Sequence, residues 1–250
     1  MINLQLGDCI ELLKRVEDNS VDFICADPPY GTTQCKWDSV IDLDLMWLEL
    51  KRVIKPRGAI VLMAQTPFDK VLGCSNLPML KYEWIWEKGN ATGFLNAKKM
   101  PLKAHENALV FSDAPEEHWN MLVFYEKLPT YEPQMTHGHE RKTTKRKSVN
   151  SECYGKAYEL TEYDSTSRYP RSVQFFSSDK QKANYHPTQK PVELMEFLIK
   201  TYSKEGDVVL DFCMGSGTTG VAAKNLNRGF IGFEKNADYF KTALNRIEGY

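Results

Sequence analysis

The chain has 250 residues, of which 42% are apolar and 26% charged, enough to bury the core of one large domain or of a core with an insertion. Its 32 Lys and Arg against 33 Asp and Glu give a net charge of -1, so a nucleic-acid partner must be argued from local charge. Six scattered cysteines without a C-x-x-C pair fit a reducing compartment. There is no run of about 20 apolar residues, as a membrane span requires. We expect a cytoplasmic protein without a membrane anchor or a metal site.

Short apolar runs predict the buried strands of a mostly parallel sheet. These runs are Asp22–Ala26, Ala59–Ala64, Ala108–Phe111, Val208–Asp211 and Gly229–Phe233. Three segments near them have helical spacing, namely Leu43–Val53, Val192–Tyr202 and Thr218–Leu226. Alternation of strands and helices indicates an α/β domain. Tyr82–Trp86 alternates apolar and polar residues, and we expect it to pair antiparallel with Ala108–Phe111 at one edge of the sheet.

Residues 128–182 interrupt this pattern, because they are rich in Pro, Thr, Ser, Tyr and charge. We interpret them as an insertion between two parts of one core, 1–127 and 183–250. The insertion holds ten basic and seven acidic residues, a net charge of +3 that leaves -4 for the remainder. Its most basic run, Arg141–Lys147, is either a solvated loop or a contact for nucleic acid.

The sequence Asp27-Pro28-Pro29-Tyr30 directly follows a predicted buried strand. Open α/β sheets bind ligands at the carboxyl ends of their strands, so a carboxylate, a rigid turn and an aromatic ring would be presented there together. The structural alternative is an ordinary turn with a tyrosine covering the core.

A second motif, Asp211–Gly220, leads from a predicted strand into a helix and has the spacing G-x-G-x-x-G. Glycines at such a turn let a ligand approach the backbone N–H groups at the start of the helix. Glu234 ends the next predicted strand, where a carboxylate accepts hydrogen bonds from ribose hydroxyls. A nicotinamide dinucleotide and S-adenosylmethionine both contain that ribose.

With these motifs in this order, the sequence resembles the permuted β-class of DNA amino-methyltransferases, and most closely their adenine-N6 members. The resemblance includes an insertion similar to a target recognition region and the segment His186–Pro191 (HPTQKP) before the glycine loop. Three further stretches belong to it, Trp84–Gly93, Lys98–Glu106 and Tyr131–Thr136. It implies a Rossmann-like methyltransferase fold with a circularly permuted motif order. Cys213 departs from the family, which usually has an aromatic residue there, and we expect Phe212 to supply that apolar contact.

The resemblance also implies roles for the catalytic residues. Asp27 and the carbonyl of Pro28 would accept the two hydrogens of the target amine, and Pro29 would hold these acceptors in place. Tyr30 would stack on a base that has left the duplex.

The implied cofactor is S-adenosylmethionine. Asp8 would contact its adenine with the help of Cys9, Glu234 its ribose, and Asp211 its amino group; Thr188 and Lys190 would pair with its carboxylate. The complete predicted cofactor set is Asp8, Cys9, Asp27, Thr188, Lys190, Asp211, Phe212, Cys213, Gly215, Ser216, Gly217, Thr218 and Glu234. We expect His186 to be structural.

Double-stranded DNA is the implied substrate, and basic residues are the candidates for phosphate contacts. They are Lys98, Lys99, Lys103, Arg141, Lys142, Lys145, Arg146, Lys147, Arg168 and Arg171. A homodimer and an accompanying restriction endonuclease both stay open.

Four other readings remain. Methylation of cytosine at N4 is the nearest alternative, although cytosine enzymes more often carry Ser in place of Asp27. An RNA or protein amine methyltransferase usually has the opposite motif order. A nicotinamide-dependent oxidoreductase would leave Asp27–Tyr30 and His186–Pro191 without a role. A binding module without catalysis would require a misplaced Asp27.

Overall fold

The computed structural model describes residues 1–33, 35, 38–94, 97–113, 130–146, 149–151, 155–157, 161–177, 185 and 189–249. Its main sheet contains eight strands in the order β1-β12-β11-β2-β3-β5-β4-β10. These strands are β1 (Ile2–Leu6), β2 (Val21–Ala26), β3 (Ile54–Ala64), β4 (Leu80–Thr92), β5 (Lys103–Phe111), β10 (Val173–Phe176), β11 (Val208–Asp211) and β12 (Gly229–Glu234). Every strand predicted from an apolar run is present, with small shifts at the ends.

The first five strands in that order, namely β1, β12, β11, β2 and β3, run parallel to one another. β5 then runs antiparallel to both β3 and β4, as Tyr82–Trp86 and Ala108–Phe111 predict. The expectation that this pair forms the edge is wrong, because β10 lies outside it, parallel to β4. The indole nitrogen of Trp86 donates to the Phe176 carbonyl over 2.9 Å, so a β4 side chain helps to hold the added strand.

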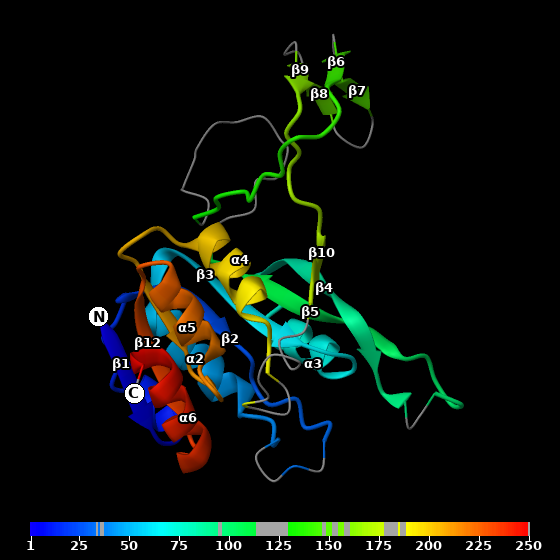
Figure 1. Cartoon of the computed structure of the whole chain (residues 1–250). Helices are drawn as coiled ribbons and strands as arrows, with labels where there is room; N and C mark the ends of the chain where they lie inside the picture. The colour runs from blue at the N-terminus through cyan, green and yellow to red at the C-terminus, as the bar shows by residue number, and fades with distance from the viewer. Residues whose placement is uncertain are drawn as a thin grey trace.

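Among the described residues, six helices cover the two faces of the sheet (Figure 1). They are α1 (Cys9–Leu13), α2 (Leu43–Val53), α3 (Phe68–Ser75), α4 (Val192–Tyr202), α5 (Thr218–Asn225) and α6 (Ala237–Glu248). Residues of β2 alternate between the faces: Ile24 packs with α1, α2 and α3, whereas Phe23 and Cys25 pack with α4, α5 and α6. The result is a three-layer α/β fold with a hydrophobic core on each side of the sheet.

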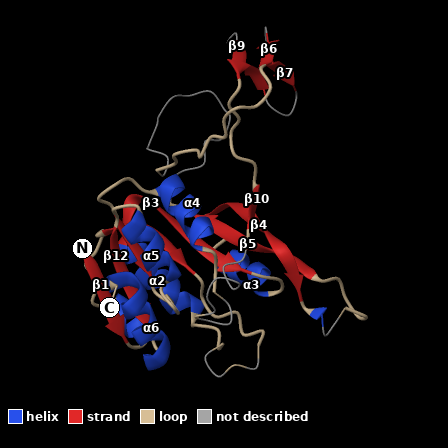
Figure 2. Ribbon diagram, in the orientation of Figure 1, coloured by secondary structure: helices blue, strands red, loops and turns tan. Residues whose placement is uncertain are grey.

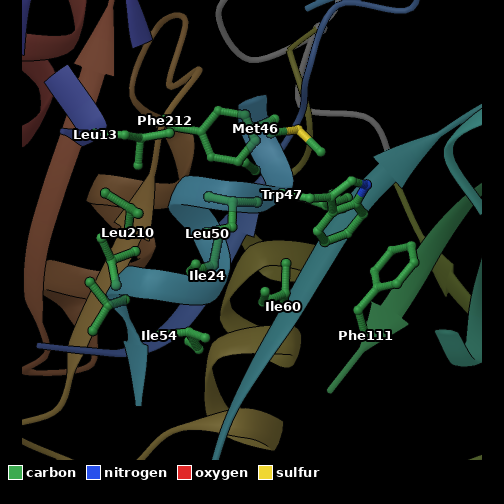
Figure 3. Packing of buried hydrophobic residues seen from close by; sticks show 14 of the residues in the cluster. Leu13, Ile24, Met46, Trp47, Leu50, Ile54, Ile60, Phe111, Leu210 and Phe212 are labelled. Carbon is green, nitrogen blue, oxygen red and sulfur yellow. The ribbon is translucent and has the colours of Figure 1, made fainter. Parts of the chain in front are cut away.

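The core under α2 shows how tightly these layers meet (Figure 3). Trp47 of α2 packs edge-on against Phe111 of β5, with ring centroids 4.7 Å apart, and its indole donates to the Ser75 hydroxyl over 2.8 Å. Phe212 lies beside Met46 in the same core, directly after β11. Packing on this face therefore reaches the start of the glycine loop.

Part of the predicted insertion lies away from this core. β6 (Lys142–Arg146) pairs with β9 (Thr161–Ser165), and β7 (Val149–Ser151) pairs with β8 (Gly155–Ala157). Figure 2 shows these short strands at a distance from the main sheet. β10, which the same predicted range includes, belongs to the main sheet instead, so the exact limits of the insertion stay a prediction. Within the described ranges, no helix has the length and apolarity needed to cross a membrane.

Candidate active site

Four parallel strands, β1, β12, β11 and β2, have their carboxyl ends side by side. A cavity of about 780 Å³ lies beyond these ends. Asp211 ends β11, Glu234 ends β12, and Asp27 follows β2 directly. Asp8 follows β1 after one glycine and caps α1, with its carboxylate accepting from the Ile10 N–H over 3.1 Å. All four carboxylates line the cavity.

The glycine loop forms the side of this cavity at the start of α5. Gly215 and Gly217 have φ of 52° and 80°, a conformation that glycine adopts without strain. A side chain at Gly217 would also lie 2.9 Å from the Cβ of Ala243, so the position has no room for one. Arg246 of α6 supports the loop by donating to the Ser216 carbonyl over 2.6 Å.

Glu234 fastens this loop to the end of β12. One carboxylate oxygen accepts from the Gly215 N–H over 2.9 Å and the other from the Asn236 N–H over 2.7 Å. Burial raises the pKa of Glu234, against the effect of these backbone donors. Glu234 also lines the cavity, where its carboxylate oxygens can accept from hydroxyl donors such as those of a ribose.

Asp211 is a nearly fully buried carboxyl on the cavity wall, 2% exposed. It accepts from the Cys213 N–H over 3.0 Å, but burial dominates and raises its pKa to about 7. Such a carboxyl gains most from a ligand that brings a positive charge into contact with it.

The adenine end predicted for the cavity contains Asp8 and two cysteines. Burial opposes ionisation of Asp8, but the Lys235 ammonium, 3.1 Å away, and the N–H groups of α1 hold its pKa below the ordinary value. Cys9 and Cys213 share a hydrogen bond that lowers the pKa of Cys9 and raises that of Cys213. Both line the cavity, as does Phe212.

Asp27 lines the same cavity and belongs to a network of charges that is largely shielded from solvent. Lys190, just before α4, donates to its Oδ2 over 2.6 Å, and the Tyr30 hydroxyl donates to its Oδ1 over 2.7 Å. Burial raises the pKa of Asp27, and the nearby Glu106 carboxylate adds to this, although Lys190 acts against it. Asp27 is therefore an anion with an enhanced ability to accept hydrogen bonds and protons.

Tyr30 is held on one face by Phe68, whose ring stacks on it with centroids 5.4 Å apart. The Lys190 ammonium lies 5.6 Å from the Tyr30 ring centroid. Burial raises the pKa of Tyr30 well above its ordinary value, so its hydroxyl stays a donor to Asp27. Stacking of this ring on a target base stays a prediction.

A family model described as DNA methylase matches residues 21–245 of the chain. The chain belongs to this family. It is 30% identical to Type II methyltransferase M1.MboII of Moraxella bovis, over 96% of this chain and 95% of that protein. It is also 30% identical to DNA adenine methyltransferase YhdJ of Escherichia coli (strain K12), over 97% of this chain and 81% of the relative.

Solved structures of DNA methyltransferases share the fold. A crystal structure of an M1.HpyAVI-SAM complex has a TM-score of 0.63 at 24% identity and covers 99% of each chain. The cytosine-N4-specific PvuII DNA methyltransferase has a TM-score of 0.67 at 16% identity and covers 98% of this chain and 86% of its own. The expectation of a Rossmann-like methyltransferase fold is confirmed.

In this DNA methylase, the predicted catalytic and cofactor residues largely converge. Those that line the cavity are Asp8, Cys9, Asp27, Pro28, Pro29, Tyr30, Lys190, Asp211, Phe212, Cys213, Gly215, Ser216, Thr218 and Glu234. Gly217 caps α5 behind the loop. Thr188 and His186 lie outside the described residues. The ammonium of Lys190 pairs with Asp27, so its predicted pairing with a cofactor carboxylate stays a prediction.

The predicted phosphate-contacting residues lie in two regions. Lys98, Lys99 and Lys103 belong to the β4–β5 hairpin, which extends beyond the sheet in Figure 1. Lys142, Lys145 and Arg146 are in β6, Arg141 directly precedes it, and Lys147 lies outside the described residues. Arg168 donates to the carbonyls of Ser165, Ser167 and Glu140, which indicates that it also supports its own loop.

Sequence reasoning missed three residues that build the site. Asp38 is buried and accepts from the N–H groups of Gly31, Thr32 and Thr33, over 2.8, 3.0 and 2.7 Å, which anchors the chain after Tyr30. Glu106 and Lys88 are paired in the network around Asp27. Only Asn107 separates Glu106 from the apolar end of β5, and a charge so close to a buried run is the signal that could have singled it out. Among the residues that the structure describes, no three His, Cys, Asp or Glu side chains form a group able to hold a metal.

Proposed function

We propose that this DNA methyltransferase transfers a methyl group from S-adenosylmethionine to the exocyclic N6 amine of an adenine that has left the double helix. We place it in the permuted β-class, because Asp27–Tyr30 precedes the glycine loop in the chain. The observation that carries the proposal is Asp27 at the carboxyl end of β2, half-buried and hydrogen-bonded to Lys190 and Tyr30, on the wall of the cavity that the glycine loop completes.

The residues of the cavity fit S-adenosylmethionine. Glu234 presents its carboxylate beside the glycine loop, where a ribose would bind, and Asp211 presents a buried carboxyl to a positively charged amino group. Asp8 and Cys9 close the end that an adenine would occupy. When bound, the cofactor supplies an electrophilic methyl group on a sulfonium.

The target amine needs help because its lone pair is delocalised into the ring of the base. Asp27 and the carbonyl of Pro28 would accept its two hydrogens, which localises the lone pair on nitrogen and aims it at the methyl carbon. The nitrogen–carbon bond then forms as the carbon–sulfur bond breaks, and the amine loses one proton. The enhanced proton affinity of Asp27 makes it the residue that would take this proton.

An aspartate at position 27 favours adenine as the target over cytosine. The second candidate, methylation of cytosine at N4, is kept because the fold is shared with a cytosine-N4-specific enzyme.

The proposal extends to a homodimer and to a companion restriction endonuclease; relatives named Type II methyltransferases support the latter. Sedimentation of the protein with and without DNA tests the dimer.

One experiment tests the proposed reaction. Double-stranded DNA is incubated with the enzyme and S-adenosylmethionine, digested to nucleosides and analysed by mass spectrometry, and we expect N6-methyladenine. Asp27→Ala should lower the rate by roughly 10²- to 10⁴-fold, the usual contribution of a positioned proton acceptor, and should change the Kd for S-adenosylmethionine far less than the rate.

Each rival reading predicts a different result. N4-methylcytosine as the product would establish the second candidate in place of adenine methylation. Tighter binding of NAD than of S-adenosylmethionine would favour an oxidoreductase. Full activity of Asp27→Ala would remove this residue from the reaction.

A further inference from the structure

Glu106 is a buried carboxylate beside Asp27 to which the proposed reaction assigns no task. It lies on β5, on the far side of β3 from Asp27, and is 9% exposed. Its Oε1 is 2.5 Å from the Lys88 ammonium, and its Oε2 is 3.2 Å from the Lys190 ammonium. Lys190 therefore stands between two carboxylates, since it also lies 2.6 Å from Asp27.

Four charges thus form a chain, in the order Lys88, Glu106, Lys190 and Asp27. A buried charge is costly unless it is paired, and a chain with two positive and two negative members satisfies all four. Burial alone would raise the pKa of Glu106, but Lys190 and Lys88 together hold it below the ordinary value. Glu106 is consequently a lasting anion.

This arrangement divides the Lys190 ammonium between two partners. An ammonium bound to Asp27 alone would neutralise that carboxylate more fully and weaken it as an acceptor for the target amine. The shorter of the two contacts, 2.6 Å, is with Asp27, so Lys190 still orients the Oδ2 atom of Asp27. Glu106 at the same time offsets part of the positive charge of Lys190.

We propose that Glu106 is a positioning residue for methyl transfer, which shares Lys190 with Asp27 and thereby keeps the Asp27 carboxylate a strong acceptor. The inference rests on the proposed function, because it requires Asp27 to accept from the amine. Lys88 holds Glu106 in place through their ion pair. The Lys88 ammonium in turn lies 5.3 Å from the Trp86 ring centroid.

The pH dependence follows from the groups around Asp27 in the part of the chain that the structure describes. Lys190 lowers the pKa of Asp27, the Tyr30 hydroxyl lowers it by donating to it, and Glu106 raises it through charge. Asp211 and Asp27 also repel each other, which raises the pKa of Asp211. Removing the charge of Glu106 must therefore lower the pKa of Asp27, both directly and by leaving Lys190 to Asp27 alone.

The test is the pH dependence of kcat in Glu106→Gln, which keeps the shape of the side chain. We expect kcat to fall roughly tenfold at neutral pH because the acceptor is weaker. The acid limb of the profile should move to lower pH by roughly one pH unit. KM for S-adenosylmethionine should stay within about twofold, and Glu106→Asp, which keeps the charge, should restore most of kcat.

Lys88→Met supplies a second variant with the opposite expectation. Without Lys88, Glu106 draws Lys190 away from Asp27, and the acid limb should move to higher pH. Glu87→Gln is the matched control, since Glu87 is the exposed neighbour of Lys88 on β4, and its profile should match the wild type. A variant that merely loses stability would lose activity sooner in acid, so it would not reproduce the shift expected for Glu106→Gln.

If the acid limb of the pH profile moves in neither Glu106→Gln nor Lys88→Met while the wild type is active, the proposed role of Glu106 is overturned. A wild-type enzyme that transfers no methyl group to adenine would instead overturn the proposed function. If Glu106→Gln fails to fold, Lys88→Met decides: its acid limb must move to higher pH while its circular dichroism over the same pH range stays that of the wild type.

Discussion

Asp211 has an unusual proton affinity for an aspartate, and this affects how a cofactor binds. With a pKa raised by burial to about 7, a large share of these carboxyls carries a proton near neutral pH. The folded state holds this proton more tightly than the unfolded chain does. The stabilisation that follows is therefore complete below pH 3.8 and is lost as the pH rises through about 7.

We predict that binding of S-adenosylmethionine expels this proton, because its amino group favours the ionised carboxylate. Its Kd should fall as the pH rises from 6 to 8, approaching tenfold per pH unit on the acid side. Calorimetry in buffers of different ionisation enthalpy measures the released proton. Asp211→Asn should bind more weakly, with a flatter pH dependence; an equal slope in this variant would assign the proton to another group.

Helix α5 shows how closely the cofactor loop is fitted to its neighbours. A Cβ at Gly220 would lie 2.4 Å from Cδ1 of Ile247 on α6 and 2.6 Å from Cε1 of Phe230 on β12. Alanine favours a helix over glycine by about 1 kcal/mol, but overpacking a core costs about 1–3 kcal/mol. We therefore predict that Gly220→Ala lowers the free energy of unfolding, measured by urea denaturation.

Gly73 of α3 is the matched control, because it is also a buried helical glycine. A Cβ there would meet Leu80 at 3.4 Å and Leu109 at 3.8 Å, which are ordinary contacts. Gly73→Ala should leave stability unchanged or raise it by up to about 1 kcal/mol. Equal changes in the free energy of unfolding at Gly220 and Gly73 would show that helix propensity, and not packing, determines the effect of the substitution.

The elements also show where sequence reasoning ends. Apolar runs such as Val208–Asp211 predict their strands because both faces are buried, and the motifs Asp27–Tyr30 and Asp211–Gly220 locate the edge of the sheet. The short β10 has exposed and half-buried residues, so its pattern has no comparable signal. Helix α6 was missed although Asn236 caps it and Gly249 ends it.

The charge network around Asp27 has a different reason for escaping prediction. Glu106 and Lys88 join the network around Asp27 only because β5 pairs antiparallel with β3 and β4 pairs antiparallel with β5. Pairing between strands far apart in the sequence depends on the whole sheet and is not encoded in any local pattern. The identities of Asp27 and Glu234 could thus be predicted, but the partners that tune Asp27 could not.

At the scale of the whole molecule, residues 141–146 of the basic run 141–147 belong to a region that Figure 2 shows apart from the core. We predict that neutralising Arg141, Lys142, Lys145, Arg146 and Lys147 to Gln weakens binding of double-stranded DNA. The slope of log K against log salt should shrink by about 0.9 for each phosphate that the variant no longer neutralises. Lys51 and Lys241, exposed on α2 and α6, form the control pair. An unchanged affinity for DNA and an unchanged salt slope would show that the basic run is a solvated loop without contact to DNA.

The buried chain of Lys88, Glu106, Lys190 and Asp27 has a consequence far from the reaction itself. Its two positive and two negative charges cancel, so its electric field dies away faster with distance than that of a lone carboxylate. Salt screens what is left within about 8–10 Å. An approaching phosphate backbone therefore meets less repulsion from Asp27 than it would from an unpaired carboxylate. We therefore expect the speed with which DNA is captured and the speed with which the methyl group is transferred to depend on separate sets of charges.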